Sequence, residues 1–345
     1  HCLDLVAKRK EIFFRFLKIH PAQSVYFELL THHNVAEGST KMKSFFRIIF
    51  SVIASFGLTQ IVTPQTSAVQ ASNSLLYEIS RKDLAKPSYI FGTIHAICPA
   101  DMIPVEGLTS YVDKSDQLLM EIDLDDPLEI GSMAKVLMIP GGKTIKDFLT
   151  TEQFQKVDEM TRSLLGYPAE NVKTIKPTLL SVMIMSSPKA IGCTPSAYDV
   201  SLMQMAVAKK KPIVGLETVE LQMKVLDSKP LDVQAKDLYA MSLDPQKYIR
   251  DFQALTSIYK EQDAEKLFER STTATPGDKE FQVKLLDERN NAWIPKIESA
   301  IKGNATFIAV GAAHLGGKVG IIKLLRSKGY SLRPIRLAPR AADGN

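Results

Sequence analysis

Short apolar runs alternate with amphipathic stretches along the chain from about residue 72 onward. Six of the runs have the length, the branched or aromatic content and the flanking breakers of β-strands. They cover residues 75–79, 89–91, 117–122, 213–216, 307–310 and 332–335. Because most of these runs lie near the two ends of this segment, we expect one sheet built from both chain ends.

Between the runs, apolar residues recur at helical spacing. The clearest helix is expected over residues 151–165, where a Thr-Glu pair opens the pattern and Gly166 ends it. Further helices are predicted over residues 178–185, 199–208, 222–226, 233–241, 245–259, 279–301 and 319–327. The pattern therefore predicts an α/β or α+β domain with a central mixed sheet and a helical insertion over roughly residues 127–300.

A segment nearer the start has the three parts of a secretory signal peptide. Basic residues follow Met42, an 11-residue apolar run spans Ile48–Leu58, and small residues lead to Ala71. A membrane span needs about 20 apolar residues, so we expect a cleaved leader over residues 42–71 and no stable membrane span afterwards. This predicts a periplasmic or secreted domain over residues 72–345. Residues 1–41 are interpreted as upstream mistranslation from a misplaced start, or as a fragment or fusion remnant.

Composition narrows the class of protein. A chain of 345 residues with 45% hydrophobic and 23% charged residues is neither disordered nor collagen-like, and 3 cysteines cannot form a disulfide scaffold or a zinc ribbon. The net charge is +5, but residues 72–345 hold 35 Lys and Arg against 34 Asp and Glu. The near-neutral domain gives a nucleic-acid partner no electrostatic support. Cys98 and Cys193, its two cysteines, are expected to form a disulfide after export.

Two histidines follow the leader, and both stand in the same local pattern. Gly92 ends one predicted strand three residues before His95, and Gly311 ends another three residues before His314. A glycine at a strand end permits a turn that can direct the imidazole across the sheet edge. A single histidine of this kind is usually a structural core residue, but two in matching contexts favour one shared site.

Acidic and basic candidates accompany these histidines. Glu121 lies inside an apolar run, where a carboxylate needs a partner unless it faces water, and Glu217 follows another strand, where it could also be a helix-terminal charge. The cluster of Asp123, Asp125 and Asp126 is typical of a solvated loop and helix cap. Arg289 lies on a long predicted helix, where a surface ion pair is the usual role. The sequence contains no nucleophile elbow, dinucleotide fingerprint, phosphate loop or His-Glu-x-x-His motif.

An ordered set of short motifs resembles the TraB/GumN family over about residues 75–337. The set comprises Gly92-Thr93-Ile94-His95, Glu121-Ile122-Asp123, Tyr198-Asp199 with Leu202, Gly215-Leu216-Glu217-Thr218 with Gln222, Glu288-Arg289-Asn290 with Trp293, and Val310-Gly311-Ala312-Ala313-His314-Leu315 with Gly329-Tyr330. The resemblance implies a fold akin to the erythromycin-esterase and ChaN haem-binding group and a relation to Tiki-like metal-dependent proteases. It also implies an active site made of both histidines, a glutamate and an arginine.

The leading hypothesis is a metal-dependent hydrolase that acts on a peptide or a related small amide or ester. His95, His314 and Glu121 would hold a divalent ion such as Zn, Mn, Co or Fe, whose bound water becomes nucleophilic. Glu217 would be the general base or a second ligand, exchanging roles with Glu121, and Arg289 would stabilise an oxyanion or a substrate carboxylate. The alternatives are a metal-free His/Glu esterase-like hydrolase and a non-catalytic haem or iron-binding protein.

The leader generates the first testable prediction. When the gene is expressed with its export machinery, N-terminal sequencing of the exported protein should begin at Ser72 or within a few residues of it, because Ala71 completes the cleavage signal. An intact leader on protein recovered from the cytoplasm would contradict this expectation.

Overall fold

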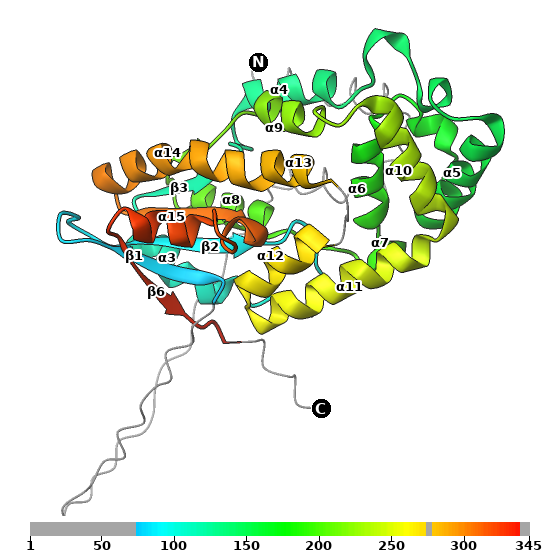
Figure 1. Ribbon diagram of the computed structural model, residues 1–345. Helices are drawn as coiled ribbons and strands as arrows, with labels where there is room; N and C mark the ends of the chain where they lie inside the picture. The colour runs from blue at the N-terminus through cyan, green and yellow to red at the C-terminus, as the bar shows by residue number, and fades with distance from the viewer. Residues whose placement is uncertain (1–73, 274–277, 339–345) are drawn as a thin grey trace, which may run out of the picture. The chain divides into compact units, whose positions relative to one another are not determined.

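The computed structural model describes residues 74–273 and 278–338, and its strands form one six-stranded mixed sheet (Figure 1). The predicted leader and residues 1–41 lie outside the described residues. The strands are β1 Leu76–Ser80, β2 Ser88–Thr93, β3 Gln117–Met120, β4 Ile213–Gly215, β5 Thr306–Gly311 and β6 Ser331–Ile335. All six strands expected from the apolar runs are therefore present, and the α/β class is confirmed.

The strand order β4-β3-β5-β2-β1-β6 joins the two ends of the domain in one sheet. Strands β4, β3, β5 and β2 are parallel to one another, whereas β1 pairs antiparallel with both β2 and β6. The late strand β5 lies between the early strands β2 and β3, with Phe91 beside Ala309 and Leu119 beside Ile308. The four parallel strands consequently end at the same edge of the sheet.

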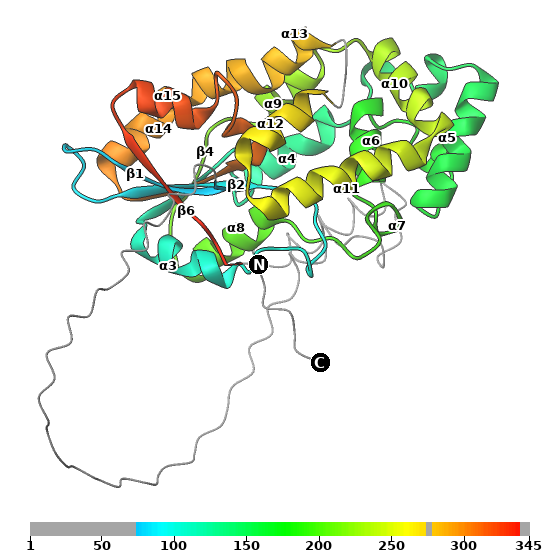
Figure 2. The same ribbon diagram turned by 60° about the horizontal axis from the view of Figure 1, so that its bottom comes forward.

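Helices cover both faces of the sheet and form a separate bundle in the middle of the sequence (Figures 1 and 2). They are α3 Glu106–Lys114, α4 Pro127–Val136, α5 Thr151–Leu164, α6 Pro177–Met185, α7 Pro188–Ile191, α8 Tyr198–Ala208, α9 Val219–Leu226, α10 Leu231–Leu243, α11 Pro245–Glu261, α12 Ala264–Thr273, α13 Lys279–Gln282, α14 Arg289–Gly303 and α15 Ile321–Ser327. A π-helix, Val283–Glu288, links α13 to α14.

The alternation of side chains along each strand explains the layers. In β5, Phe307 and Ala309 pack with α3 and α8 on one face, whereas Ile308 and Val310 pack with α14 and α15 on the other. Because the parallel strands are buried on both faces, they appear in the sequence as continuous apolar runs. Because apolar layers cover both faces of the sheet, polar side chains are left to the edge where the parallel strands end.

The helical region has a third apolar core of its own. Helices α5, α6 and α10 contribute Val157, Leu180 and Leu238, each buried. The helix α5 begins with a capping box in which Thr150 and Gln153 exchange hydrogen bonds. The expected helical insertion between β3 and β5 is thus present, with β4 as its one contribution to the sheet among the described residues.

Several boundaries differ from those expected from the sequence. The predicted strand over residues 117–122 ends at Met120, so that Glu121 follows it. The predicted helix over residues 279–301 is α13, the π-helix and α14 in succession. The sequence pattern does not predict helices α3, α4, α7 and α12. Asp126 caps α4 by accepting the Leu128 N–H (2.8 Å), as expected of this acidic cluster.

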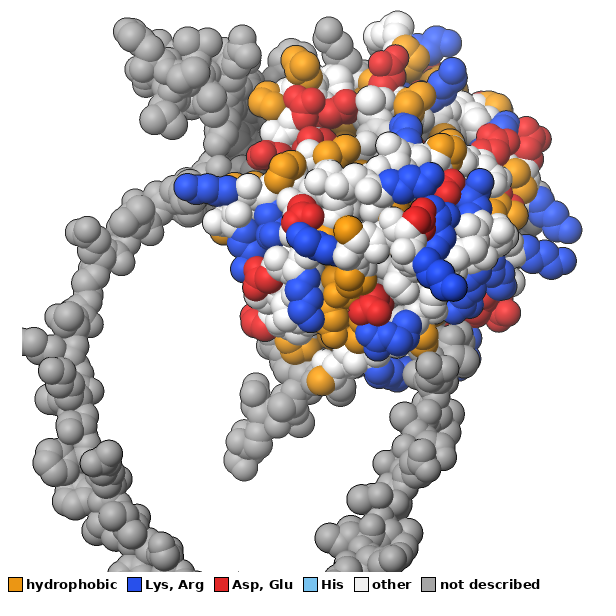
Figure 3. Space-filling model, turned by 90° about the vertical axis from the view of Figure 1, so that its left-hand side faces the viewer, with side chains coloured by type: hydrophobic (Ala, Val, Ile, Leu, Met, Phe, Trp, Pro, Cys, Tyr) orange, Lys and Arg blue, Asp and Glu red, His pale blue; other side chains and the backbone are white. Residues whose placement is uncertain are grey.

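The surface carries both signs of charge. On the face shown in Figure 3, basic and acidic side chains lie among uncharged ones. Some of these charges are paired; for example, Arg333 on β6 forms a cross-strand ion pair with Glu78 on β1 (2.8 Å). Within residues 74–273 and 278–338, no helix is long and apolar enough to cross a membrane.

The close approach of β2 to the turn after β5 gives a prediction on stability. A Cβ at Gly92 would lie 2.8 Å from the Leu315 side chain and 2.9 Å from Ala312 Cα. Gly92→Ala should therefore lower the free energy of unfolding by about 1–3 kcal/mol in urea titrations. Gly107→Ala on α3 is the matched control, because no atom lies within 4 Å of its added Cβ. Equal stability of the two variants would contradict the expectation.

Candidate active site

The carboxyl ends of the four parallel strands bring together the polar residues singled out in the sequence. His95 follows β2, Glu121 follows β3, Glu217 follows β4, and His314 lies in the short 3-10 turn after β5. Arg289 reaches the same edge from the start of α14. The structure therefore places all five residues at one sheet edge, where Arg289, Glu121, Glu217 and His314 are linked by direct contacts.

Arg289 is the centre of this network. It is only 6% exposed, whereas a surface ion pair was its expected role by default. Its Nη2 donates to Glu121 Oε2 and to Glu217 Oε1, both at 2.7 Å, and its Nε donates to Glu217 at 3.1 Å. Its Nη1 donates to the Leu285 carbonyl (2.9 Å) and lies 3.1 Å from His314 Nε2. One cation thus binds two carboxylates and one imidazole.

Glu121 is buried and fully hydrogen-bonded. Its Oε1 accepts the Gly311 N–H (2.7 Å), and its Oε2 accepts from Arg289 and from Gln222 (3.2 Å). Burial alone would raise the pKa of this carboxyl, but the basic side chains around it and the Gly311 N–H lower the pKa to about 2. Glu121 is therefore an anion at neutral pH.

Glu217 has a different environment, although it also pairs with Arg289. Both of its oxygens accept from Arg289, and Oε2 also accepts from the Trp293 indole N–H (3.3 Å). Its side chain is as buried as that of Arg289. These contacts favour a role in holding Arg289, because both oxygens are already engaged.

His314 is buried against Trp293, with 4.6 Å between the ring centres. Its Nδ1 lies 2.7 Å from Asn290 Oδ1, and Asn290 in turn donates to the His314 carbonyl (3.2 Å). Burial lowers the pKa of His314 to about 3, so the ring is neutral at neutral pH. A neutral ring that donates through Nδ1 presents the lone pair of Nε2 to Arg289.

His95 differs from His314 in exposure and in charge. Its side chain is 68% exposed, and its Nδ1 donates to Asp199 Oδ2 at 3.0 Å. The negative charge of Asp199 raises the pKa of His95 to about 9. Asp199 also accepts from the Thr93 hydroxyl (3.1 Å). The exposed imidazole is therefore held by a partner on its Nδ1 side.

A glycine at the end of β5 provides common space for these groups. A Cβ built on Gly311 would lie 3.2 Å from Glu121 Oε1, 3.6 Å from His314 Cδ2 and 4.0 Å from His95 Nε2. The three candidate side chains consequently approach the same point of the backbone at Gly311, His314 by a ring carbon.

The donor set suits a divalent ion in its chemistry. Two imidazoles have Nδ1 fixed by an outer oxygen, as metal-ligating histidines usually do, and a carboxylate oxygen lies beside them. His314 Nε2 and Glu121 Oε1 are 3.9 Å apart, and Arg289 contacts both side chains. Among the described residues, no group of three or more His, Cys, Asp or Glu side chains is arranged so that it could hold a metal ion.

Sequence reasoning gave no role to four polar residues of the network. Asp199, Gln222, Asn290 and Trp293 each contact one of the predicted site residues. All four belong to the motifs that resemble the TraB/GumN family, and this membership was the only indication in the sequence that they could be site residues. Their partners lie as many as 104 positions away, so local pattern could not assign the contacts.

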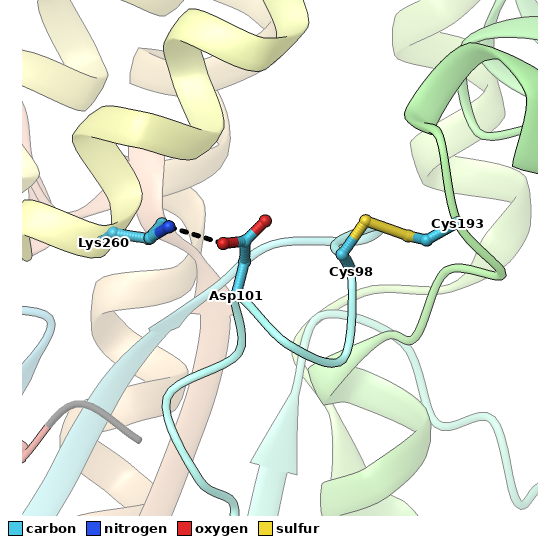
Figure 4. The surroundings of a disulfide bond; sticks show 4 residues. All are labelled: Cys98, Asp101, Cys193 and Lys260. Atoms are coloured by element: carbon cyan, nitrogen blue, oxygen red, sulfur yellow. Dashed lines mark hydrogen bonds and ion pairs between the residues drawn. A yellow bond between two sulfur atoms is a disulfide. The ribbon is translucent and has the colours of Figure 1, made fainter. Parts of the chain in front are cut away.

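The expected disulfide lies next to this network. Cys98 and Cys193 are bonded, with 5.8 Å between their Cα atoms (Figure 4). Cys98 is three residues after His95, and Cys193 is six residues before Asp199. The bond therefore joins the loop after β2 to the segment that leads into α8.

Comparisons with known proteins show which sequences this chain resembles. The chain is 24% identical to the metalloprotease TIKI2 of Xenopus tropicalis over 314 residues, which is 75% of this chain and 59% of that protein. It is 24% identical to the TIKI2 of Danio rerio over 315 residues (75% and 60%) and to the TIKI1 of Homo sapiens over 325 residues (78% and 63%). No solved structure matches the chain.

The chain thus matches less than two thirds of the length of these relatives. A family model covers residues 75–334, from the first strand of the sheet to the last, and includes every residue of the network described above. By this match the chain belongs to the TraB/PrgY/gumN family.

Proposed function

We propose that this protein is an exported metal-dependent hydrolase that cleaves a peptide or a related small amide or ester. One observation carries the proposal: His95, His314 and Glu121 come from three parallel strand ends and approach the same point of the backbone at Gly311. The metalloprotease names of the distant relatives support the hydrolytic class. Export after the predicted leader over residues 42–71 belongs to the same proposal.

His95, His314 and Glu121 would hold the divalent ion. When bound, such an ion supplies Lewis acidity, which polarises a carbonyl oxygen and makes water nucleophilic at neutral pH. The chain contributes two of the three ligand states that such an ion needs, because Glu121 is ionised and His314 is neutral. His95 is protonated at neutral pH and would release a proton when it binds the ion. The outer partners Asp199 and Asn290 hold the two rings through Nδ1.

Arg289 and Glu217 would hold the other site residues in place and would not take part in the reaction themselves. Arg289 uses its guanidinium N–H groups on Glu121, Glu217, His314 and the Leu285 carbonyl. These contacts favour a role in placing Glu121 over the oxyanion role expected from the sequence. They favour Glu217 as the residue that holds Arg289, rather than as the general base.

A metal-free hydrolase is the second candidate, and a specific contact favours it. Arg289 already satisfies His314 Nε2 and Glu121 Oε2, and His95 is the exposed imidazole with a carboxylate behind it. In this case the deprotonated form of His95, a minority at neutral pH because its pKa is about 9, would be the general base that takes a proton from water. Asp199 would stabilise the imidazolium that forms.

Metal removal distinguishes the two candidates. The full chain, treated with chelator, should lose the ability to cleave a mixed peptide library and should regain it with Mn²⁺, Zn²⁺ or Co²⁺, as followed by mass spectrometry of new termini. His95→Ala and His314→Ala should each lower metal retention and reduce turnover by at least about 100-fold, because each removes a ligand.

Glu121→Gln should resemble the histidine variants, since it replaces the anionic ligand by a neutral amide. Glu78→Gln is the matched control, because Glu78 is also a strand carboxylate paired with an arginine but lies on β1, next to β6. Activity that persists in chelator would support the metal-free candidate. Failure to cleave peptide, amide and ester substrates would overturn both.

The buried neutral state of His314 predicts a stability effect of pH. In the folded protein its pKa is about 3, whereas in the unfolded chain it binds a proton below its ordinary pKa of 6.5. Between these values the unfolded state holds the extra proton, so stability is present above pH 6.5 and is lost as the pH falls.

From pH 7 to pH 5, chelator-treated wild type should lose about 2 kcal/mol more unfolding free energy than His314→Asn in urea titrations. Because both proteins have the same carboxylates, the contribution of these groups to the pH dependence cancels in the difference between wild type and variant. Equal losses in the two proteins would show that His314 is not held neutral.

A further inference from the structure

We propose that Asp199 is the positioning residue of His95, and that the Cys98–Cys193 disulfide keeps the two residues in register. The inference rests on the proposed function only in taking His95 as a residue of the active site. Among the described residues, no hydrogen bond or ion pair joins Asp199 or the disulfide to Glu121 or Arg289, so their effect would pass through His95.

Both carboxylate oxygens of Asp199 accept hydrogen bonds from residues at or just after the end of β2. Oδ2 accepts from His95 Nδ1 (3.0 Å) and Oδ1 accepts from the Thr93 hydroxyl (3.1 Å). A carboxylate in the first turn of a helix usually serves that helix by capping it or by opposing its dipole. Here α8 has no side-chain cap at its N-cap residue, Ala197, and the carboxylate is only 14% exposed. The contacts therefore point to His95 as the group that Asp199 serves.

Fixing Nδ1 has a chemical consequence at the opposite ring nitrogen. With its Nδ1–H donated to Asp199, His95 carries its second proton on Nε2, and this nitrogen presents a lone pair once that proton is lost to solvent or on metal binding. That nitrogen approaches the point of the backbone at Gly311 that Glu121 Oε1 also approaches. The same orientation serves a metal ligand and a general base, so the inference holds for either candidate function.

The two segments that carry His95 and Asp199 are joined at two further points. Ile97 and Ser196 exchange backbone hydrogen bonds of 3.0 and 2.8 Å, and the disulfide joins Cys98 to Cys193 (Figure 4). Because His95 is 68% exposed, packing around the ring cannot by itself fix its orientation. The covalent link therefore adds to the backbone hydrogen bonds and to the burial of Ile97 in holding the loop beside Asp199.

The start of α8 is also joined to the loop after β2 by a buried hydrogen bond. Tyr198, which precedes Asp199, is fully buried and donates its hydroxyl to the carbonyl of Ile103 in that loop (3.0 Å). The bridge at Ile97, the disulfide and this hydrogen bond together hold the loop that carries His95 beside Asp199.

The experiment compares Asp199→Ala and Asp199→Asn with wild type in the full chain. Asp199→Ala removes the acceptor for Nδ1–H, whereas Asp199→Asn retains an oxygen at that position. Asp101→Ala is the matched control, since Asp101 lies on the same loop three residues after Cys98 and pairs with Lys260 instead (Figure 4). The readouts are the His95 Nδ1–H resonance in ¹⁵N-histidine-labelled protein, assigned with His95→Gln, and kcat and KM on the peptide library.

Asp199→Ala should lose the Nδ1–H resonance and lower kcat about 10–100-fold, with KM changed less than about twofold, because an outer partner orients its histidine without touching substrate. Asp199→Asn should recover the resonance and part of the lost kcat. Cys98→Ser/Cys193→Ser should weaken the resonance while the far-UV spectrum shows a retained fold.

A resonance that persists in Asp199→Ala, or an equal loss of kcat in Asp101→Ala, would overturn the role of Asp199. An unchanged resonance and kcat in the double serine variant would overturn the role of the disulfide. If wild type cleaves no substrate, the proposed function fails, whereas the resonance still decides whether Asp199 holds the ring.

Discussion

The burial of Arg289 between Glu121 and Glu217 is the interaction on which the site depends. Removing a charge from water is costly, and a buried ion pair is stable only when its remaining hydrogen bonds are satisfied. Arg289 meets this condition through two carboxylates, a backbone carbonyl and the lone pair of His314. Loss of one partner would leave an uncompensated charge at the centre of the sheet edge. The geometry of Glu121 and His314 is therefore coupled to a residue that substrate does not need to touch.

The strands and the convergence of the two histidines could be predicted from the sequence, for a simple reason. Parallel strands that are buried on both faces produce continuous apolar runs, and β2 and β5 are both of this kind. Parallel neighbours end at one edge, so matching glycine-to-histidine spacings after β2 and β5 place His95 and His314 together. Glu121 was recognisable because a carboxylate in an apolar run needs a partner.

The contacts of Arg289 and Asp199 could not be predicted in the same way. Arg289 stands on a helix whose charged neighbours suggest an exposed face, and a π-helix over Val283–Glu288, a feature often found at functional sites, precedes it. Asp199 is paired with a residue 104 positions away across an antiparallel bridge between two loops. Hydrophobic periodicity carries no information on such pairings, because they depend on how loops are joined after the layers have packed. The same limit applies to helices α3, α4, α7 and α12, which the pattern does not predict.

The position of β5 between β2 and β3 determines when the candidate site can form during synthesis of the chain. Until residues 306–311 leave the ribosome, the two early strands have no common neighbour, and Glu121 lacks the Gly311 N–H that holds it. The helical bundle can form earlier, because its core is local to residues 139–249. A nascent chain of 300 residues can thus fold its helical middle but still lacks the β5 contacts that complete the candidate site. The topology makes the appearance of the site coincide with the completion of the domain.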